Sequence, residues 1–462
     1  MNRDTKNLYF IGDMLHLNSS QLAAEIKKHG PGAGMEGNDQ DRKFKSLMDD
    51  LDHPQYYKLW KSRFSYIRNL AGIHGDFYRS PTMNRLSRIK QLGIISTDIF
   101  FNCNQTREVH SDIVAMLAEI VMDSYDFTED EINLAIASGL LHDAAMPPMS
   151  DQGKLANRAE LDEEDNIIYI VERPDVKKIL DNYGIRPEDV VACVRGEYPT
   201  IGRLLNSSEV DLDKISYTAL DTFHLFNETV NKAYAPNNLG IDPRQEEKDE
   251  VINQIYGALA HPDLFDIYQD MEITSDREVL FRDPRRLYNF LKIRALMFKY
   301  VYRNPINVAR EAFLRRHVED LWNDGTLNRE GMLNMTDGDF ETILRQRLPR
   351  AVYNAAFSDF PEDHLHPIHR TTTMTEEELK VIFPGDEYVV APAYRFNPST
   401  STAVKSNRHP YTMPFSEAFP IETSEIEDIA SDLNYINVYR MEDSGRDWVF
   451  PKFGGDYKTR GD

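Results

Sequence analysis

The sequence predicts a mainly α-helical protein with a small α+β lobe at its C-terminal end. Two patterns predict the helices. Apolar residues recur at helical spacing from 109 to 121, and a capping box of Thr128 with Glu131 opens a second apolar-periodic run to Leu140. A third pattern predicts the lobe, because residues 387–391, 435–439 and 448–450 have strand-like composition. Most of the chain is therefore expected to pack helix on helix.

Composition narrows the class of protein. The chain has 462 residues, 41% hydrophobic and 28% charged, as in soluble globular proteins, and its length predicts two or three domains. A net charge of −23 argues against general nucleic-acid binding, which needs a basic surface. Two cysteines, Cys103 and Cys193, exclude a disulfide scaffold. No long apolar run and no signal peptide occur, so we expect a soluble, cytoplasmic protein without membrane contact.

Three parts are predicted along the chain: an N-terminal extension at 1–55, a helical core at 56–345 and the α+β lobe at 346–462. Helices of the core are expected at 56–93, 109–121, 128–141, 167–171, 187–194, 208–232, 247–260, 285–303 and 307–322, with a short hairpin at 94–105. Helices of the lobe are expected at 375–383 and 424–433. Loops are expected at 364–369, which is rich in histidine, and at 397–414.

Two histidines stand at the ends of the predicted helical hairpin. His110 begins the first helix, and His142 followed by Asp143 ends the second. Antiparallel packing of the two helices would bring His110 near the His-Asp pair, where imidazoles and a carboxylate can bind a transition metal. An isolated His-Asp dipeptide is weak evidence, but its place after a hairpin that begins with histidine makes the signal much stronger.

A further helix carries the next candidates. Asp213, Tyr217 and Asp221 are spaced i, i+4 and i+8 and therefore lie on one face, with Lys214 beside them. Two carboxylates, a phenol and a cation in one stripe are unusual for a core face and favour a binding face. The alternative is a solvated stripe on a surface helix.

In this order the motifs resemble those of a known family. Arg107-x-x-His110-Ser, then His142-Asp143, then Asp213-Lys-x-x-Tyr-x-x-x-Asp resemble the HD-domain deoxynucleoside triphosphate triphosphohydrolases. That group includes bacterial dGTP triphosphohydrolases and the sterile-alpha-motif HD-domain dNTPase of animal cells. The resemblance covers roughly residues 60–320. It implies an HD-domain helical core and the metal-dependent hydrolysis of a dNTP to the deoxynucleoside and tripolyphosphate.

The resemblance also implies roles for individual residues. The implied metal ligands are His110, His142, Asp143 and Asp213. The implied contacts to the triphosphate are Arg107 and Lys214, and those around the sugar are Gln91, Tyr217 and Asp221. The remaining residues implied to bind substrate are Leu92, Arg294 and Tyr302.

Cofactors and partners follow from the same resemblance. Two imidazoles and two carboxylates suit Mn, Fe, Ni, Co or Zn, and Mg is a further candidate. A homo-oligomer is implied, and an activating nucleotide is left open. The preferred base and the identity of the metal are not fixed by the sequence.

The chain departs from the family pattern at three positions. Met146, Asp151 and Glu163 stand where the family carries histidines. Asp151 and Glu163 are candidates for proton transfer, provided that burial raises a carboxylate pKa towards neutrality. Two alternatives stay open: an HD-type enzyme that acts on another nucleotide phosphoester, or a catalytically weakened nucleotide sensor or assembly subunit.

Overall fold

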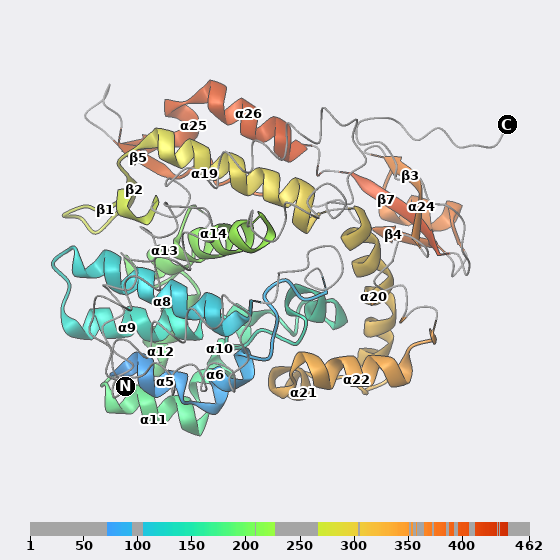
Figure 1. The fold of residues 1–462 in the computed structure, drawn as a ribbon, viewed down its shortest axis with the longest axis horizontal. Coiled ribbons are helices and arrows are strands. Elements are labelled where there is room, and N and C mark those ends of the chain that lie inside the picture. The colour runs from blue at the N-terminus through green and yellow to red at the C-terminus, as the bar shows by residue number, and fades with distance from the viewer. Residues whose placement is uncertain are drawn as a thin grey trace, which may run out of the picture.

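The computed structural model describes most of the chain from residue 72 onward. The described residues are 72–94, 105–207, 209–226, 267–303, 305–350, 353, 357, 365–371, 374–384, 388–391, 396–405, 412–431, 433 and 435–441. The predicted N-terminal extension, the helix at 247–260, the strand at 448–450 and most of the hairpin at 94–105 lie outside these ranges. The described part is mainly helical with a few short strands, which confirms the predicted fold class (Figure 1).

The helical part is built from helices whose starts the sequence marks. Ser80, Thr106 and Asp162 each accept a hydrogen bond from a backbone N–H of the turn that they cap. Up to residue 226 the helices are α5 (Ile73–Tyr78), α6 (Pro81–Leu86), α8 (Arg107–Asp123), α9 (Glu129–Leu141), η1 (Ser150–Ala156), α10 (Glu163–Val171), α11 (Pro174–Asn182), α12 (Pro187–Val194), α13 (Ile201–Leu205) and α14 (Leu212–Phe226). From residue 267 they are η2 (Ile267–Asp270), α19 (Pro284–Met297), the π-helix η3 (Phe298–Tyr302), α20 (Pro305–Asn323), α21 (Arg329–Asn334) and α22 (Asp337–Arg347).

The hairpin of α8 and α9 positions the rest of the core (Figure 1). Thr128 and Glu131 form the predicted capping box at the start of α9. The two helices lie close together at Gly139, where an added Cβ would lie 2.8 Å from the Cα of Ala115. Because α14 also packs against α8, the first turn of α8, the end of α9 and the start of α14 come together at one place.

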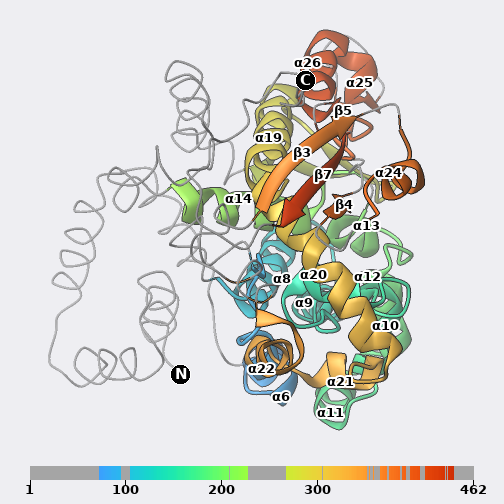
Figure 2. The same cartoon turned by 90° about the vertical axis from the view of Figure 1, so that its right-hand side faces the viewer.

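A three-stranded antiparallel sheet lies against α20 near the C-terminus (Figure 2). Its strand order is β3-β7-β4, with β3 at Leu365–Thr371, β7 at Ile436–Met441 and β4 at Tyr388–Ala391. Phe313 of α20 packs with Ala391 and Tyr439 of the sheet in one hydrophobic cluster. Helix α24 (Glu376–Ile382) packs against β4.

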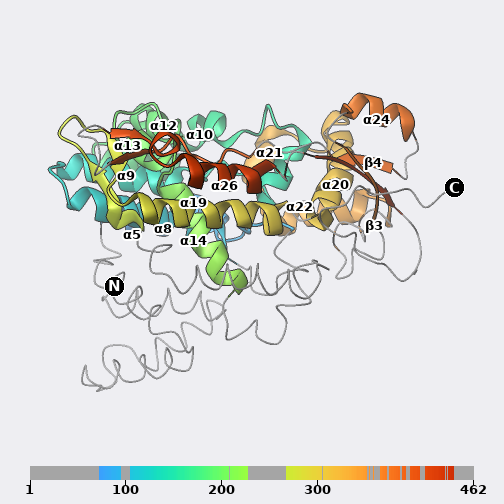
Figure 3. The same ribbon diagram turned by 90° about the horizontal axis from the view of Figure 1, so that it is seen from above.

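A second, four-stranded sheet joins distant parts of the chain. Its order is β1-β2-β5-β6, with β1 at Met271–Ile273, β2 at Val279–Phe281, β5 at Ala403–Lys405 and β6 at Thr412–Pro414. After β6 come α25 (Phe415–Ala418) and α26 (Pro420–Ser431), and α26 lies along α19 (Figure 3). Phe415 and Ile426 belong to the main hydrophobic core. Side chains that follow β6 thus contribute to the core that the helices form.

Two predicted loops are wrong, because they contain strands. The loop expected at 397–414 contains β5 and β6, and the stretch expected as a loop at 364–369 contributes to β3. Strands of three residues are too short to show an alternating pattern, and the pairing of Phe281 with Val404 joins residues far apart in the sequence. Among the described residues, no helix has the length and apolarity needed to cross a bilayer.

Candidate metal centre and adjoining cavity

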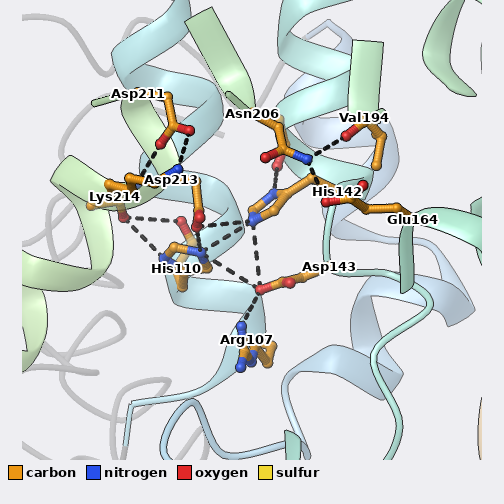
Figure 4. A network of polar contacts seen from close by, with 12 residues as sticks. Arg107, His110, His142, Asp143, Glu164, Val194, Asn206, Asp211, Asp213 and Lys214 are labelled. Carbon is orange, nitrogen blue, oxygen red and sulfur yellow. Dashed lines mark hydrogen bonds and ion pairs between the residues drawn. The ribbon is translucent and has the colours of Figure 1, made fainter. Parts of the chain in front are cut away.

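Four side chains predicted to bind a metal meet where the three helices come together (Figure 4). His110 lies in the first turn of α8, His142 and Asp143 follow the last turn of α9, and Asp213 lies in the first turn of α14. The Nε2 atoms of the two histidines are 3.1 Å apart. Asp213 Oδ1 lies 2.9 Å and 3.6 Å from these nitrogens, and Asp143 Oδ2 lies 3.6 Å and 3.5 Å from them.

This donor set fits a divalent metal ion. Adjacent donors that are each about 2.1 Å from one ion lie roughly 3.0–3.4 Å from each other, close to the separations measured here. His110, His142 and Asp143 offer ligand atoms that all lie within 4.8 Å of one another. Asp213 approaches the imidazole pair from the side opposite Asp143 (Figure 4). Two imidazoles and two carboxylates suit the divalent transition metals named above.

The Nδ1 atom of each imidazole, which faces away from the centre, also has a hydrogen-bond partner. His142 Nδ1 lies 2.7 Å from the carbonyl oxygen of Gly139 and can only donate to it, so the lone pair of a neutral His142 is on Nε2. His110 Nδ1 lies 3.1 Å from Ser216 Oγ. Hydrogen bonds of this kind fix the tautomer and orientation of metal-binding histidines. The chain therefore presents both Nε2 atoms to the same point.

The charges of the centre depend on one another. Burial lowers the pKa of His110, whereas in His142 the effect of burial is outweighed by Asp143 and Asp213, which raise its pKa to about 9. Burial disfavours the ionised form of both carboxylates. Arg107 and the two histidines nevertheless hold the pKa of Asp143 low, and the histidines hold the pKa of Asp213 well below its usual range. A cation bound here would compete with the proton on His142.

Arg107 is bound to one of the candidate ligands. Its Nη1 donates to Asp143 Oδ2 at 2.7 Å and its Nε donates to Ser150 Oγ at 2.9 Å. Ser150 in turn donates to the Lys90 carbonyl oxygen. The guanidinium is buried and also lies 3.8 Å from Asp151. It therefore orients Asp143 and holds it ionised, in addition to lining the cavity described below.

Lys214 is directed away from the centre. Its ammonium donates to Asp211 Oδ2 at 2.6 Å and to the carbonyl oxygen of Ser207 at 2.7 Å. Figure 4 places this pair beside Asp213, on the side away from Asp143. The resemblance implied that Lys214 contacts a triphosphate, but in this geometry the segment before α14 holds its ammonium.

A cavity of about 490 Å³ adjoins the metal centre. That volume lies in the range of small-molecule sites, roughly 300–1,000 Å³. The predicted site residues that line it are Gln91, Leu92, Arg107, His142, Asp143, Asp151, Glu163, Asp213, Tyr217, Asp221 and Tyr302. His110, Lys214 and Arg294 are not among the lining residues. Most of the residues predicted from distant parts of the sequence thus face one space.

Asp221 is the centre of a hydrogen-bonded group in this cavity. Tyr302 donates to its Oδ2 at 2.6 Å, and the side-chain amide of Gln105 donates to its Oδ1. Burial raises the pKa of Asp221 to about 7, although both hydrogen bonds oppose that shift. One helical turn towards the metal centre, Tyr217 accepts a hydrogen bond from Arg294 Nε at 2.7 Å. Gln105 was not predicted, because a lone glutamine before a helix carries no motif.

The three departures from the family pattern lie together with an unpredicted lysine. Lys154 Nζ lies 3.0 Å from Asp151 Oδ1 and 2.5 Å from Glu163 Oε2, and Met146 lines the same cavity. Lys154 and Arg107 hold the pKa of Asp151 at about 2, and its side chain is 62% exposed. Burial raises the pKa of Glu163. Burial thus moves the pKa of Glu163 in the direction that a proton-transfer carboxylate needs, whereas the pKa of Asp151 moves in the opposite direction.

Comparisons with known proteins show the fold. No family model matches the sequence, and no curated protein matches it significantly. A hypothetical protein from Aquifex aeolicus has a similar structure with a TM-score of 0.60 and 20% identity, covering 80% of this chain and 92% of that one. A phosphohydrolase from Bacteroides thetaiotaomicron matches with a TM-score of 0.56 and 14% identity, over 80% and 96% of the two chains. This chain shares their fold.

Proposed function

We propose that this chain is a metal-dependent phosphohydrolase that cleaves a deoxynucleoside triphosphate into the deoxynucleoside and tripolyphosphate. The observation that carries the proposal is the convergence of His110, His142, Asp143 and Asp213 beside a cavity of about 490 Å³. The fold shared with a protein named a phosphohydrolase supports the reaction class. The order of the motifs supports the nucleotide substrate.

A divalent ion held by these four residues would polarise a phosphoryl oxygen and lower the pKa of a water molecule. Within the chain, Arg107 holds Asp143 ionised and in place through a hydrogen bond of 2.7 Å. The hydrogen bonds from His142 to Gly139 and from His110 to Ser216 keep the two imidazoles facing Asp213. These contacts preorganise the site before substrate arrives.

The other end of the cavity suits a deoxyribose. Tyr217 and Asp221 follow Asp213 at four-residue intervals, so Asp221 lies about 12 Å further along α14. The buried carboxylate of Asp221 and the amide of Gln91 can hydrogen-bond a 3′-hydroxyl group. The side-chain oxygen of Gln91 has no hydrogen-bond partner among the described residues, which fits a polar group kept for a ligand.

Proton transfer falls to Glu163 rather than Asp151. A general acid or base works best when its pKa lies near the operating pH. Burial moves the pKa of Glu163 upward from that of an ordinary glutamate, whereas Lys154 and Arg107 keep Asp151 ionised far below neutral pH. Met146 can neither donate nor accept a proton in this role.

A second candidate function is hydrolysis of a nucleotide phosphoester with fewer phosphates. The cavity is lined by more carboxylates than cations, and its cations are Arg107, Lys154, Arg158 and Arg303. Lys214 is held elsewhere. A triphosphate carries more negative charge than a monoester or diester and is opposed more strongly by these carboxylates.

The test is a panel of the four dNTPs with Mn, Mg and Co, followed by analysis of the phosphate products. Because the resemblance implies an oligomer and leaves open an activator, each reaction is repeated with a second nucleotide present. Tripolyphosphate as the inorganic product supports the proposal. Nucleotide monoesters and diesters are assayed alongside, and orthophosphate released from a monoester, or a monoester released from a diester, favours the second candidate. Asp213→Ala should abolish turnover, and Asp165→Ala, at an exposed carboxylate on α10, is the matched control. If the protein binds nucleotides but turns none of them over under any condition, the alternative of a catalytically weakened nucleotide sensor is favoured.

A further inference from the structure

Lys154 is placed where an anion entering the cavity would meet it. It lies in η1, its side chain is only 10% exposed, and it lines the cavity beside the metal centre. Its ammonium contacts one carboxylate on each side, with Asp151 Oδ1 at 3.0 Å and Glu163 Oε2 at 2.5 Å. A buried ammonium needs such partners to stay charged. These two carboxylates hold Lys154 protonated, with a pKa above that of an ordinary lysine.

The other cations that line the cavity differ from Lys154 in their contacts. Arg107 donates to Asp143 and Ser150, which tie it to the metal centre. Arg303 forms an ion pair with Glu311 at 3.1 Å. The remaining one, Arg158, follows Lys154 by four residues, is exposed, and has no hydrogen-bond or ion-pair partner among the residues that the structure describes. Lys154 and Arg158 thus both line the cavity, and neither is bound to a candidate metal ligand as Arg107 is to Asp143.

We propose that Lys154, assisted by Arg158, binds the phosphate chain of the substrate and exchanges its contact with Glu163 for a phosphate oxygen. The inference rests on the proposed function and assigns the phosphate subsite within it. An ammonium has three N–H donors, and that of Lys154 is held by Asp151 and Glu163 as ion pairs, so a phosphate oxygen can be added or can replace one carboxylate. This subsite takes the role that the resemblance gave to Lys214.

Loss of the Lys154 contact changes the balance between the ionised and protonated forms of Glu163. The charged groups around this carboxylate are Lys154 and Asp151 of η1 and Arg107 of α8. Lys154 is the main cation that favours its ionised form, while burial and Asp151 favour the protonated form. When phosphate takes up the ammonium, Glu163 loses that stabilisation and its pKa rises further. Substrate binding thus favours the protonated form of Glu163, which can donate a proton.

Binding of inorganic tripolyphosphate tests the subsite without any turnover. Calorimetry is run on the metal-loaded protein at a fixed concentration of free metal. We expect Lys154→Met to weaken tripolyphosphate binding about ten- to a hundredfold, since a charge-assisted hydrogen bond is lost. Lys154→Arg keeps the charge and should stay within about threefold of the parent protein. Lys214→Met, which removes an ammonium held by Asp211, should weaken binding less than Lys154→Met does.

A double-mutant cycle separates a binding role of Lys154 from a structural one. Glu163→Gln should tighten tripolyphosphate binding, because it frees the ammonium from a competing carboxylate. The same substitution in a Lys154→Met background should give a much smaller gain. The double variant also carries no unpaired Glu163 charge, so it keeps the test usable if Lys154→Met alone unfolds, and thermal melting checks this.

The experiments distinguish a failure of the phosphate subsite from a failure of the proposed function. Parent affinity in Lys154→Met, an equal effect of Glu163→Gln in both backgrounds, or a parent protein that does not bind tripolyphosphate would each overturn the subsite. If the protein binds tripolyphosphate through Lys154 but cleaves no dNTP, the subsite stands and the proposed function fails. If it cleaves dNTPs and Lys154→Met binds tripolyphosphate normally, the function stands and the subsite fails.

Discussion

Gly139→Ala is expected to disturb the metal centre from outside it. The added Cβ would lie 2.8 Å from the Cα of Ala115 and 2.9 Å from its N, and both are backbone atoms of α8 that cannot rotate away. Ordinary contact begins at 3.4 Å, so the two helices must separate by about 0.6 Å at this point. Overpacking of a close helix contact costs about 1–3 kcal/mol of stability.

The same displacement acts on the ligands. His110 lies on α8 and His142 follows α9, and the Gly139 carbonyl oxygen accepts the hydrogen bond that orients His142. Metal sites need ligand distances close to ideal, and loss of an orienting contact typically lowers metal affinity about ten- to a hundredfold. We therefore expect Gly139→Ala to lower both the melting temperature and the affinity for metal.

Thermal melting and a metal titration with Mn measure the two effects. The matched control is Gly338→Ala in α22, where the nearest atom to an added Cβ is 4.0 Å away. Alanine should stabilise that helix by up to about 1 kcal/mol and leave metal binding unchanged. If Gly139→Ala melts and binds metal as the parent protein does, the close packing of α8 on α9 does not position the centre.

Three further predictions concern single groups. His74 has its ring nitrogens 3.6 Å and 3.4 Å from Asp112 and Glu119, and these carboxylates outweigh burial and raise its pKa from 6.5 to about 8. Its stabilising effect should be fully present below pH 6.5 and lost as the pH rises through 8. Urea unfolding should therefore show that His74→Gln costs about 1 kcal/mol at pH 6 and less at pH 9; the cost is small because both carboxylates are partly exposed to solvent. Asp221→Asn should remove a transition near pH 7 from the pH profile of kcat/KM and weaken discrimination against a 3′-deoxy analogue about tenfold; an unchanged profile would contradict a role at the sugar. Glu163→Gln should lower kcat about a hundredfold or more without weakening nucleotide binding, and wild-type turnover would remove it from proton transfer.

The helical core was predictable because its signals are local. The capping box of Thr128 and Glu131 and the apolar period from 109 to 121 each involve neighbours within a few turns. If these two helices pack antiparallel, the start of α8 lies beside the end of α9, and His110 is therefore close to His142 and Asp143. The role of the four residues as ligands remains a prediction, although the structure brings their donor atoms together.

The remaining features depend on side-chain direction and distant pairing. Helical spacing places Lys214 beside Asp213, but it cannot show that Asp211 and the Ser207 carbonyl oxygen hold the ammonium. Lys154 carries no motif, and its importance appears only when Asp151 and Glu163 are seen on either side of it. Likewise, Phe281 pairs with Val404, which lies far along the chain, and no local pattern in the sequence predicts such a pairing.

Metal content tests the central claim most directly. The parent protein, Asp213→Ala and the control Asp165→Ala are each loaded with Mn, Fe, Co, Ni or Zn, dialysed and analysed for bound metal. The donor geometry predicts close to one tightly bound ion per chain in the parent protein and the control, and a nearly empty site in Asp213→Ala, because that carboxylate lies 2.9 Å from His110 Nε2. Full occupancy in Asp213→Ala, or a parent protein that retains none of these metals, would contradict a metal centre formed by these four residues.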